Sequence, residues 1–177
     1  MATKDYFLKI EGIEGESTAE GHKGEIDVES FDWGESRRLY LNPGDERNSP
    51  LEVKNFHFTA FVSKASTKLM TACATVQKFE KAIFTLHKAG GKKEEYMKFT
   101  FYDVRIASYD IGGPATETSR PEKIGHEIGE NPVPLDRVVL NFAEIEVDYR
   151  EQKSTGNVGP AGKFKYNLKR GKPPESR

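Results

Sequence analysis

Hydrophobic and polar residues alternate along much of the chain with the period of two that is typical of β-strands. The alternation covers residues 6–10 and returns over residues 26–33, with a polar loop between the two segments. In the second segment the phase slips, because Phe31 and Trp33 lie an odd number of residues from Val28. This strand is therefore expected either to bulge or to bury both of its faces in turn.

Five further segments are rich in β-branched and aromatic residues and predict strands. They cover residues 51–62, 81–88, 96–111, 138–149 and 163–169. A glycine pair separates the second segment from the third, so we expect these two strands to form an antiparallel hairpin. The alternation changes phase again near residue 102. Such slips are typical of packed sheets that share bent strands, and they also fit subunits that meet edge to edge.

One segment has the spacing of a helix instead. Its apolar residues recur at intervals of three and four after Ser63 and Ser66, either of which could cap the first turn. We therefore expect a mainly β fold, in which two antiparallel sheets form a compact β-barrel or sandwich with one flanking α-helix at about residues 65–78. The length of 177 residues fits a single domain, which we place at residues 1–169. We expect residues 170–177 to be a disordered tail.

Several sequence blocks occur in an order and spacing that are specific as a set, although no single block is decisive. They are KIEGIEGES, EIDVESFDWG, KASTKLMTAC, LHKAGG, VVLNFAEIEVDY and FKYNL. Over residues 5–168 this pattern resembles the haemolysin-coregulated protein (Hcp) family, the tube subunits of bacterial type VI secretion systems. The resemblance implies a β-barrel subunit of a hexameric ring, and rings that stack into a tube.

The resemblance also implies partners and a location. The expected partners are identical subunits, a spike protein at the tube tip, a surrounding contractile sheath, and effector proteins carried in the lumen. The tube would be assembled in the bacterial cytoplasm and secreted without a cleaved signal peptide, to the outside or into target cells. Consistent with this, the N-terminal residues contain no apolar run of signal-peptide length, and no stretch approaches the 18 apolar residues of a membrane span.

Two sets of residues are candidates for contact with partners. Apolar residues within the long polar segment 35–50 either cover the edge of their own barrel or dock on a neighbour, and the resemblance favours docking. The candidate interface and stacking residues are Arg37, Arg38, Leu39, Tyr40, Leu41, Asp45 and Arg47. The charges depart from the small, Gly-rich loop of many members. The resemblance places Ser30 and Asp32 at the lumen, as cargo contacts, with Asp32 in place of a small neutral residue.

Composition excludes several classes of function. Lys and Arg number 27 and Asp and Glu 28, so a formal charge of −1 provides no field to gather nucleic acid or to bind an anionic membrane. The single cysteine, Cys73, excludes an intramolecular disulfide and is expected in the core, on the buried face of the helix.

We find no motif for catalysis, a metal or a cofactor. The four histidines, His22, His57, His87 and His126, lie far apart, and no GxSxG elbow or phosphate-binding glycine loop occurs. The acidic residues around His22 are interpreted as a solvated loop. Glu144, Glu146 and Asp148 share one strand face, and we interpret them as a solvated or lumen-facing stripe rather than the carboxylate pair of a glycosidase.

Two alternative functions remain at this stage. An OB-like module for single-stranded nucleic acid would use Phe164 and Tyr166 beside lysines at 163, 165 and 169, but the near-zero net charge argues against it. A carbohydrate-active β-sandwich would use Trp33, Tyr102 or Tyr109 as sugar platforms. A single tryptophan gives that reading little support.

Overall fold

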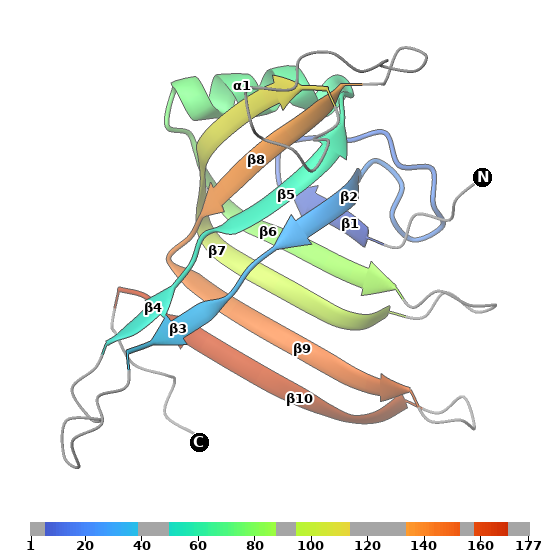
Figure 1. The fold of residues 1–177 in the computed structure, drawn as a ribbon. Coiled ribbons are helices and arrows are strands. Elements are labelled where there is room, and N and C mark those ends of the chain that lie inside the picture. Colours follow the sequence, from blue (N-terminus) through green and yellow to red (C-terminus); the bar gives the residue numbers. More distant parts are fainter. Residues whose placement is uncertain (1–5, 39–49, 88–94, 114–133, 153–157, 170–177) are drawn as a thin grey trace, which may run out of the picture.

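The computed structural model describes residues 6–38, 50–87, 95–113, 134–152 and 158–169. Within these ranges the chain forms ten strands and one helix (Figure 1). The elements are β1 (Tyr6–Ile10), β2 (Ile26–Asp32), β3 (Glu35–Arg37), β4 (Leu51–Val53), β5 (Phe56–Phe61), α1 (Lys64–Ala74), β6 (Lys78–His87), β7 (Glu95–Gly112), β8 (Leu135–Asn141), β9 (Glu144–Gln152) and β10 (Val158–Asn167).

Eight of the strands form one antiparallel sheet in the order β10-β9-β7-β6-β1-β2-β5-β8. The end strand β8 also pairs with β7, which closes six of the strands into a barrel and leaves β9 and β10 as an extension beside β7. Strands β3 and β4 form a separate two-stranded ribbon. The expected mainly β fold with one helix is confirmed. The two sheets expected from the sequence are two layers of one sheet that closes on itself.

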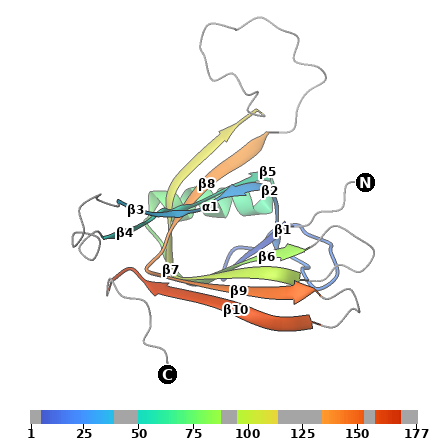
Figure 2. The same ribbon diagram turned by 60° about the horizontal axis from the view of Figure 1, so that its bottom comes forward.

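Strand β7 belongs to both layers because it changes partner in its middle. Met97–Tyr102 pair with β9, whereas Arg105–Gly112 pair with β8. Between them, Asp103 has a φ of 54°, in the left-handed region that a non-glycine residue rarely adopts. Figure 2 shows the second half of the strand turning away with β8. The phase change predicted near residue 102 marks this bend.

Strand β2 bulges, which is one of the two outcomes that its phase slip predicted. Its register against β5 shifts between Val28 and Ser30. The shift turns Phe31 inward, where its ring packs edge-on against Tyr6 at 5.3 Å between centroids and lies 4.7 Å from that of Phe84. The bulge therefore re-aims the end of β2 while its alternation continues.

Two of the strands expected from the sequence are each divided in the structure. Residues 51–62 form β4 and β5, which are separated at Lys54 and Asn55. Residues 138–149 turn at Phe142 and Ala143, where the Ala143 amide donates a 3.0 Å hydrogen bond to the carbonyl of Tyr102. Because Phe142 is buried at this turn, the apolar pattern continues through it and hides the break.

The helix ends earlier than its apolar spacing predicts, at Ala74 instead of about residue 78. Its first turn is capped by Ser63, whose hydroxyl accepts from the Ala65 amide. At the other end Val76 has a φ of 54°, which stops the helical backbone before β6 begins. Cys73 was expected in the core but is only partly buried, packed against the edge of it.

The core is aromatic, with Phe56, Phe58, Phe84 and Phe101 almost fully buried between the layers. Burial of each such side chain contributes roughly 1.5–3 kcal/mol. On the opposite face of β1, Phe7 is also fully buried, because the loop before β2 folds over it.

Gly15 allows the close packing of this loop. A Cβ atom there would lie 2.2 Å from the carbonyl oxygen of Glu25.

Candidate assembly and cargo surfaces

Ser30 and Asp32 lie on the exposed side of β2, on a surface that continues across three more strands. The bulge in β2 places Ser30 opposite Thr59 of β5, and the two hydroxyls are 2.7 Å apart. Asp32 lies opposite His57 in the next row. The same rows continue over β8 and the second half of β7. We call the outward side of β2, β5, β8 and residues 106–112 of β7 the four-strand face.

The four-strand face is polar and slightly hollowed. A depression of about 340 Å³ is lined by both predicted cargo residues and by His57, Ser108, Asp110 and Arg137, among others. Arg137 lies opposite Asp110 and donates a 2.7 Å hydrogen bond to the carbonyl of Gly113. The depression is wide and open, so it suits a contact surface for a macromolecule better than a site for a small ligand.

The four-strand face has two strand edges without strand partners among the described residues. Strand β1 pairs with β2 only at Asp27 and Ile26, so the far edge of Ser30–Asp32 is open. Strand β6 pairs with β7 only up to Arg105, which leaves the far edge of residues 106–112 open. Open edges carry unpaired backbone groups that another strand can join.

The predicted interface arm begins on the ribbon of β3 and β4, which projects from the barrel (Figure 1). Arg37 and Arg38 are exposed there, as is the whole of β3. The remaining candidates, Leu39, Tyr40, Leu41, Asp45 and Arg47, fall outside the residues that the structure describes. Their role as an interface remains a prediction.

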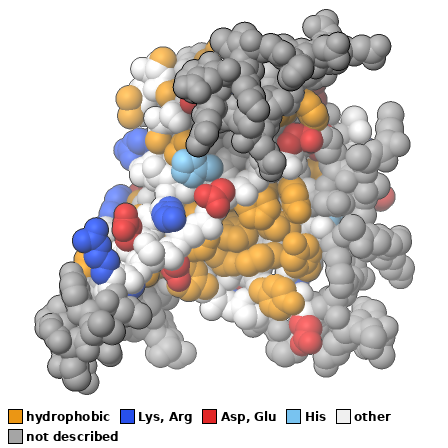
Figure 3. Space-filling model, in the orientation of Figure 1, with side chains coloured by type: hydrophobic (Ala, Val, Ile, Leu, Met, Phe, Trp, Pro, Cys, Tyr) orange, Lys and Arg blue, Asp and Glu red, His pale blue; other side chains and the backbone are white. Residues whose placement is uncertain are grey.

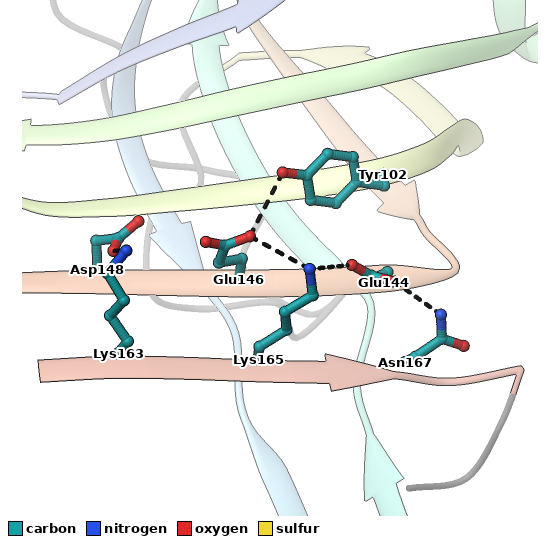
Figure 4. A network of polar contacts seen from close by, with 7 residues as sticks. All are labelled: Tyr102, Glu144, Glu146, Asp148, Lys163, Lys165 and Asn167. Carbon is teal, nitrogen blue, oxygen red and sulfur yellow. Dashed lines mark hydrogen bonds and ion pairs between the residues drawn. The ribbon is translucent and has the colours of Figure 1, made fainter. Parts of the chain in front are cut away.

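The acidic stripe on β9 is crossed by lysines from β10 (Figure 4). Lys165 lies 2.9 Å from Glu144 and 3.7 Å from Glu146, and Lys163 lies 3.4 Å from Asp148. The hydrogen bond to Glu144 raises the pKa of Lys165. This stripe lies on the side of β9 away from the core, since the alternate residues Ile145 and Val147 are buried, and its carboxylates are paired with cations.

Tyr102 completes this network, since its hydroxyl donates a 3.4 Å hydrogen bond to Glu146. Burial, followed by the charge of Glu146, raises the pKa of Tyr102. Glu144 and Glu146 both lie beside the Lys165 ammonium group, so these carboxylates are part of a surface ion-pair network. This arrangement does not support the carbohydrate-hydrolysing alternative.

The same strand argues against the OB-like alternative. Tyr166 points inward and is only 8% exposed, and Phe164 is packed against the core. The lysines at 163 and 165 point to the opposite side, where their charges are paired. Aromatic rings and free cations thus do not share one surface, as a single-strand binding groove requires.

Two of the proposed sugar platforms are also engaged within the subunit. Trp33 is partly buried, with its ring centroid 5.9 Å from that of Phe99. The Tyr109 hydroxyl donates a 2.6 Å hydrogen bond to the buried carboxylate of Asp136, and burial with this bond raises the pKa of Tyr109 to about 12.

The histidines form one pair that the sequence did not predict. His22 contacts His87 with 2.8 Å between their Nε2 atoms, and His22 Nδ1 is 2.8 Å from a Glu25 oxygen. Loop and strand residues 65 positions apart give no periodic signal, so only the fold brings them together. His57 is exposed on β5, and His126 falls outside the described ranges.

The residues that the structure describes bear on metal binding and on membrane insertion. Among them, no three His, Cys, Asp or Glu side chains are placed to hold a metal ion together. The helix that the structure describes there is too short and too polar to span a membrane.

Comparison with known proteins supports a single family. The model of the family described as "Type VI secretion system effector, Hcp" matches residues 7–149. Protein hcp1 of Pseudomonas aeruginosa strain PAO1 is 32% identical over 169 residues, which cover 93% of this chain and 95% of the relative.

Solved structures agree. Hcp1 from Salmonella typhimurium is 28% identical, with a TM-score of 0.71, and the match covers 96% of this chain and 97% of that one. A structure described as a type six secretion system protein has a TM-score of 0.82 at 22% identity, over 97% of this chain and 100% of that one, and shows likeness of fold.

Hcp proteins are structural, non-enzymatic proteins that type VI secretion systems secrete. The family model, the P. aeruginosa relative and the shared barrel together establish that this chain belongs to the Hcp family of type VI secretion system tube proteins.

Proposed function

We propose that this chain forms hexameric rings that stack into the inner tube of a type VI secretion system and carry effector proteins in the lumen. The observation that carries the proposal is the pair of open edges on the four-strand face, at Ser30–Asp32 and at residues 106–112. Neighbouring strands of the four-strand face are antiparallel, so β2 and the second half of β7 run in opposite directions. The β7 edge of one copy can therefore pair with the β2 edge of the next as antiparallel strands. Repeated head-to-tail contacts of this kind close into a ring when the rotation allows. The number six follows from the family.

Apolar surface beside the β2 edge supports the same contact. Figure 3 shows apolar side chains gathered between β2 and the strands of the β6–β7–β9 layer. Partly buried Tyr6, Phe31 and Trp33 pack against the core in this part of the barrel. A contiguous apolar patch next to an open strand edge is typical of a surface that another subunit covers.

In this arrangement the four-strand face lines the lumen, and Ser30 and Asp32 contact cargo. The ribbon of β3 and β4 carries the arm at 37–47 toward the neighbouring subunit or ring. The paired network on β9 and β10 lies on the outer wall, toward the sheath, and a spike protein caps the tube. The tube assembles in the cytoplasm and leaves the cell without a cleaved signal peptide.

Native mass spectrometry and light scattering test the ring. At tens of micromolar protein in moderate salt, we expect six copies of the 19.9 kDa chain. Neighbours must bury at least about 1,000 Å² between them to persist at micromolar concentration. A monomer under these conditions would contradict the proposal.

Disulfide trapping tests the edges themselves. In a Cys73→Ser background, Asp32→Cys is combined in turn with Ser108→Cys, Asp110→Cys or Gly112→Cys. Within one subunit two strands separate the positions, so their Cα atoms are roughly 14 Å apart, beyond the roughly 7 Å limit for a disulfide. We expect at least one pair to give a covalent ladder up to six subunits on oxidation. Rings that form without any ladder would place the contact elsewhere.

A further inference from the structure

The pair of histidines ties the loop before β2 to the end of β6. His22 belongs to the loop, and His87 is the last residue of β6. Their Nε2 atoms are 2.8 Å apart, with the ring planes at 86°. The His22 ring also stacks on Phe7 of β1, with 4.2 Å between centroids and planes 4° apart. One imidazole therefore closes the loop over a side chain that is fully buried.

The hydrogen bond between the rings needs one donor and one acceptor. When Glu25 accepts from the Nδ1–H of His22, the His22 Nε2 keeps its lone pair and accepts from His87 Nε2–H. A single added proton leaves such a bond possible, since one ring then donates and the other still accepts. Two added protons make the bond impossible, because two N–H groups would then face each other at 2.8 Å with no lone pair between them.

We propose that the His22–His87 contact is an acid-sensitive latch, which holds the loop of residues 12–25 against β6 at neutral pH and releases it when both rings are protonated. Histidine side chains change charge between about pH 5 and 8. Release would uncover Phe7, whose face of β1 is otherwise covered by the loop. The latch is a property of the subunit and does not depend on ring formation.

Charged groups lie on several elements beside the pair. The carboxylates belong to three elements, and lysines lie on β1 and β7. These groups are Glu25, Asp27 opposite Phe7, Glu95 opposite His87, Lys98 at 3.7 Å from Glu95, and Lys9 on the same face as Phe7. None of them removes the clash between the two Nε2–H groups.

The sign of the pH dependence follows from proton counts. The open loop leaves both rings free to bind a proton, whereas the closed pair accommodates one. The open state therefore binds more protons in acid, and the closed state loses stability as the pH falls. With one extra proton bound, the closing equilibrium changes by up to about tenfold per pH unit in this range.

Hydrogen exchange of the full-length protein at pH 7.5 and 5.0 tests the latch, after correction for intrinsic exchange rates. The reporters are the amides of Gly15, Ser17 and Gly24, which donate to carbonyls within the loop at 2.8–3.0 Å. We expect protection to fall at least about tenfold in the wild type. In His87→Gln, whose amide can pair with either form of His22, the fall should be under about threefold.

His57→Gln is the matched control, because this histidine is exposed on β5 and far from the loop in the sheet order. It should keep the wild-type pH dependence. If His87→Gln does not fold, as judged by circular dichroism at pH 7.5, His22→Gln replaces it with the same expectation. Unchanged wild-type protection at pH 5.0, or an equal fall in the glutamine variant, would overturn the latch.

Discussion

The hydroxyl of Ser66 donates a 2.5 Å hydrogen bond to the carboxylate of Asp136, joining the first turn of α1 to β8. Asp136 is 1% exposed, and its other oxygen accepts from Tyr109 of β7. Ser66 also accepts from the Ser63 amide at the helix cap. One buried carboxylate thus fixes the helix against the two strands that close the barrel.

Asp136→Ala should destabilise the protein by about 2–4 kcal/mol, because it leaves two buried hydroxyl groups without their acceptor. Chemical denaturation monitored by circular dichroism measures the loss. Asp110→Ala, on the neighbouring strand and exposed, is the matched control and should cost less than about 0.5 kcal/mol. Equal losses of stability in the two variants would mean that the hydrogen bonds of the buried Asp136 carboxylate contribute nothing measurable.

Alkaline titration followed by absorbance should show a tyrosine ionisation step near pH 12, which we assign to Tyr109. Its folded pKa of about 12 lies above the ordinary value of 10.0, so the folded state holds the proton longer than the unfolded chain does. The stability from this group is complete below pH 10 and is lost as the pH rises toward 12. Tyr109→Phe should remove the step near pH 12. Its persistence in that variant would assign it to another residue.

The bend of β7 at Asp103 combines an unusual backbone angle with two ion pairs. Lys169 and Lys78 lie 2.8 Å and 2.7 Å from its carboxylate and lower its pKa to about 2. Because the folded pKa is lowered, this stabilisation is present above about pH 4 and is lost as the pH falls toward 2.

Asp103→Asn should shift the urea midpoint less than Asp103→Ala does, since asparagine tolerates the left-handed conformation better than alanine. The order of the two midpoints is the measurement. If both variants shift equally, the backbone angle costs the alanine variant nothing and the ion pairs account for the effect.

The sequence was sufficient for the class of fold because the alternation in β5 and β10 reflects burial on one side of each strand. It also located the bends, since the phase slips coincide with the β2 bulge and with Asp103. The break at residues 142–143 was missed because the buried Phe142 continues the apolar pattern through it. The break at Lys54 and Asn55 was missed because strand-like residues lie on both sides of it. Those boundaries depend on tertiary pairing rather than on local pattern.

The candidate surfaces were predictable only in part. Ser30 and Asp32 are exposed, as a contact with cargo requires, but the strands that extend their surface, β5, β8 and β7, lie far away in sequence. The pairing of the acidic stripe with Lys163 and Lys165 required the register of β9 and β10. The contact of His22 with His87 required the loop to fold over β1. Each of these depends on long-range pairing, which residue spacing does not encode.

The arm at 37–47 gives a prediction about stacking. Replacing Leu39 and Tyr40 with Ser should shorten or abolish tubes seen by electron microscopy, while the melting temperature stays within about 2 °C. A small loss at each copy of the arm would be multiplied by the six copies of a ring. Val76→Ser, at a residue 65% exposed beyond α1, is the control and should leave tubes intact. Equal losses of stacking and stability would mean that the arm covers its own barrel.

Asp32 gives the prediction about cargo. It is exposed at the end of β2, in the depression shared with His57 and Arg137, so a hexameric ring would place six such carboxylates around the lumen. This field would favour basic passengers and disfavour acidic ones. Asp32→Arg should therefore abolish co-purification of a basic passenger while the mass of the ring is unchanged.

Glu80→Arg makes the same change of charge on β6, outside the four-strand face, and serves as the control for Asp32→Arg. The control should retain the passenger, because its new cation lies away from the depression, whereas six arginines in the lumen would repel a basic surface. Reversal of preference toward an acidic passenger in Asp32→Arg would identify charge, rather than shape, as the basis of selection. If the basic passenger binds undiminished to Asp32→Arg rings, cargo does not contact this residue, and the selection must lie elsewhere on the face.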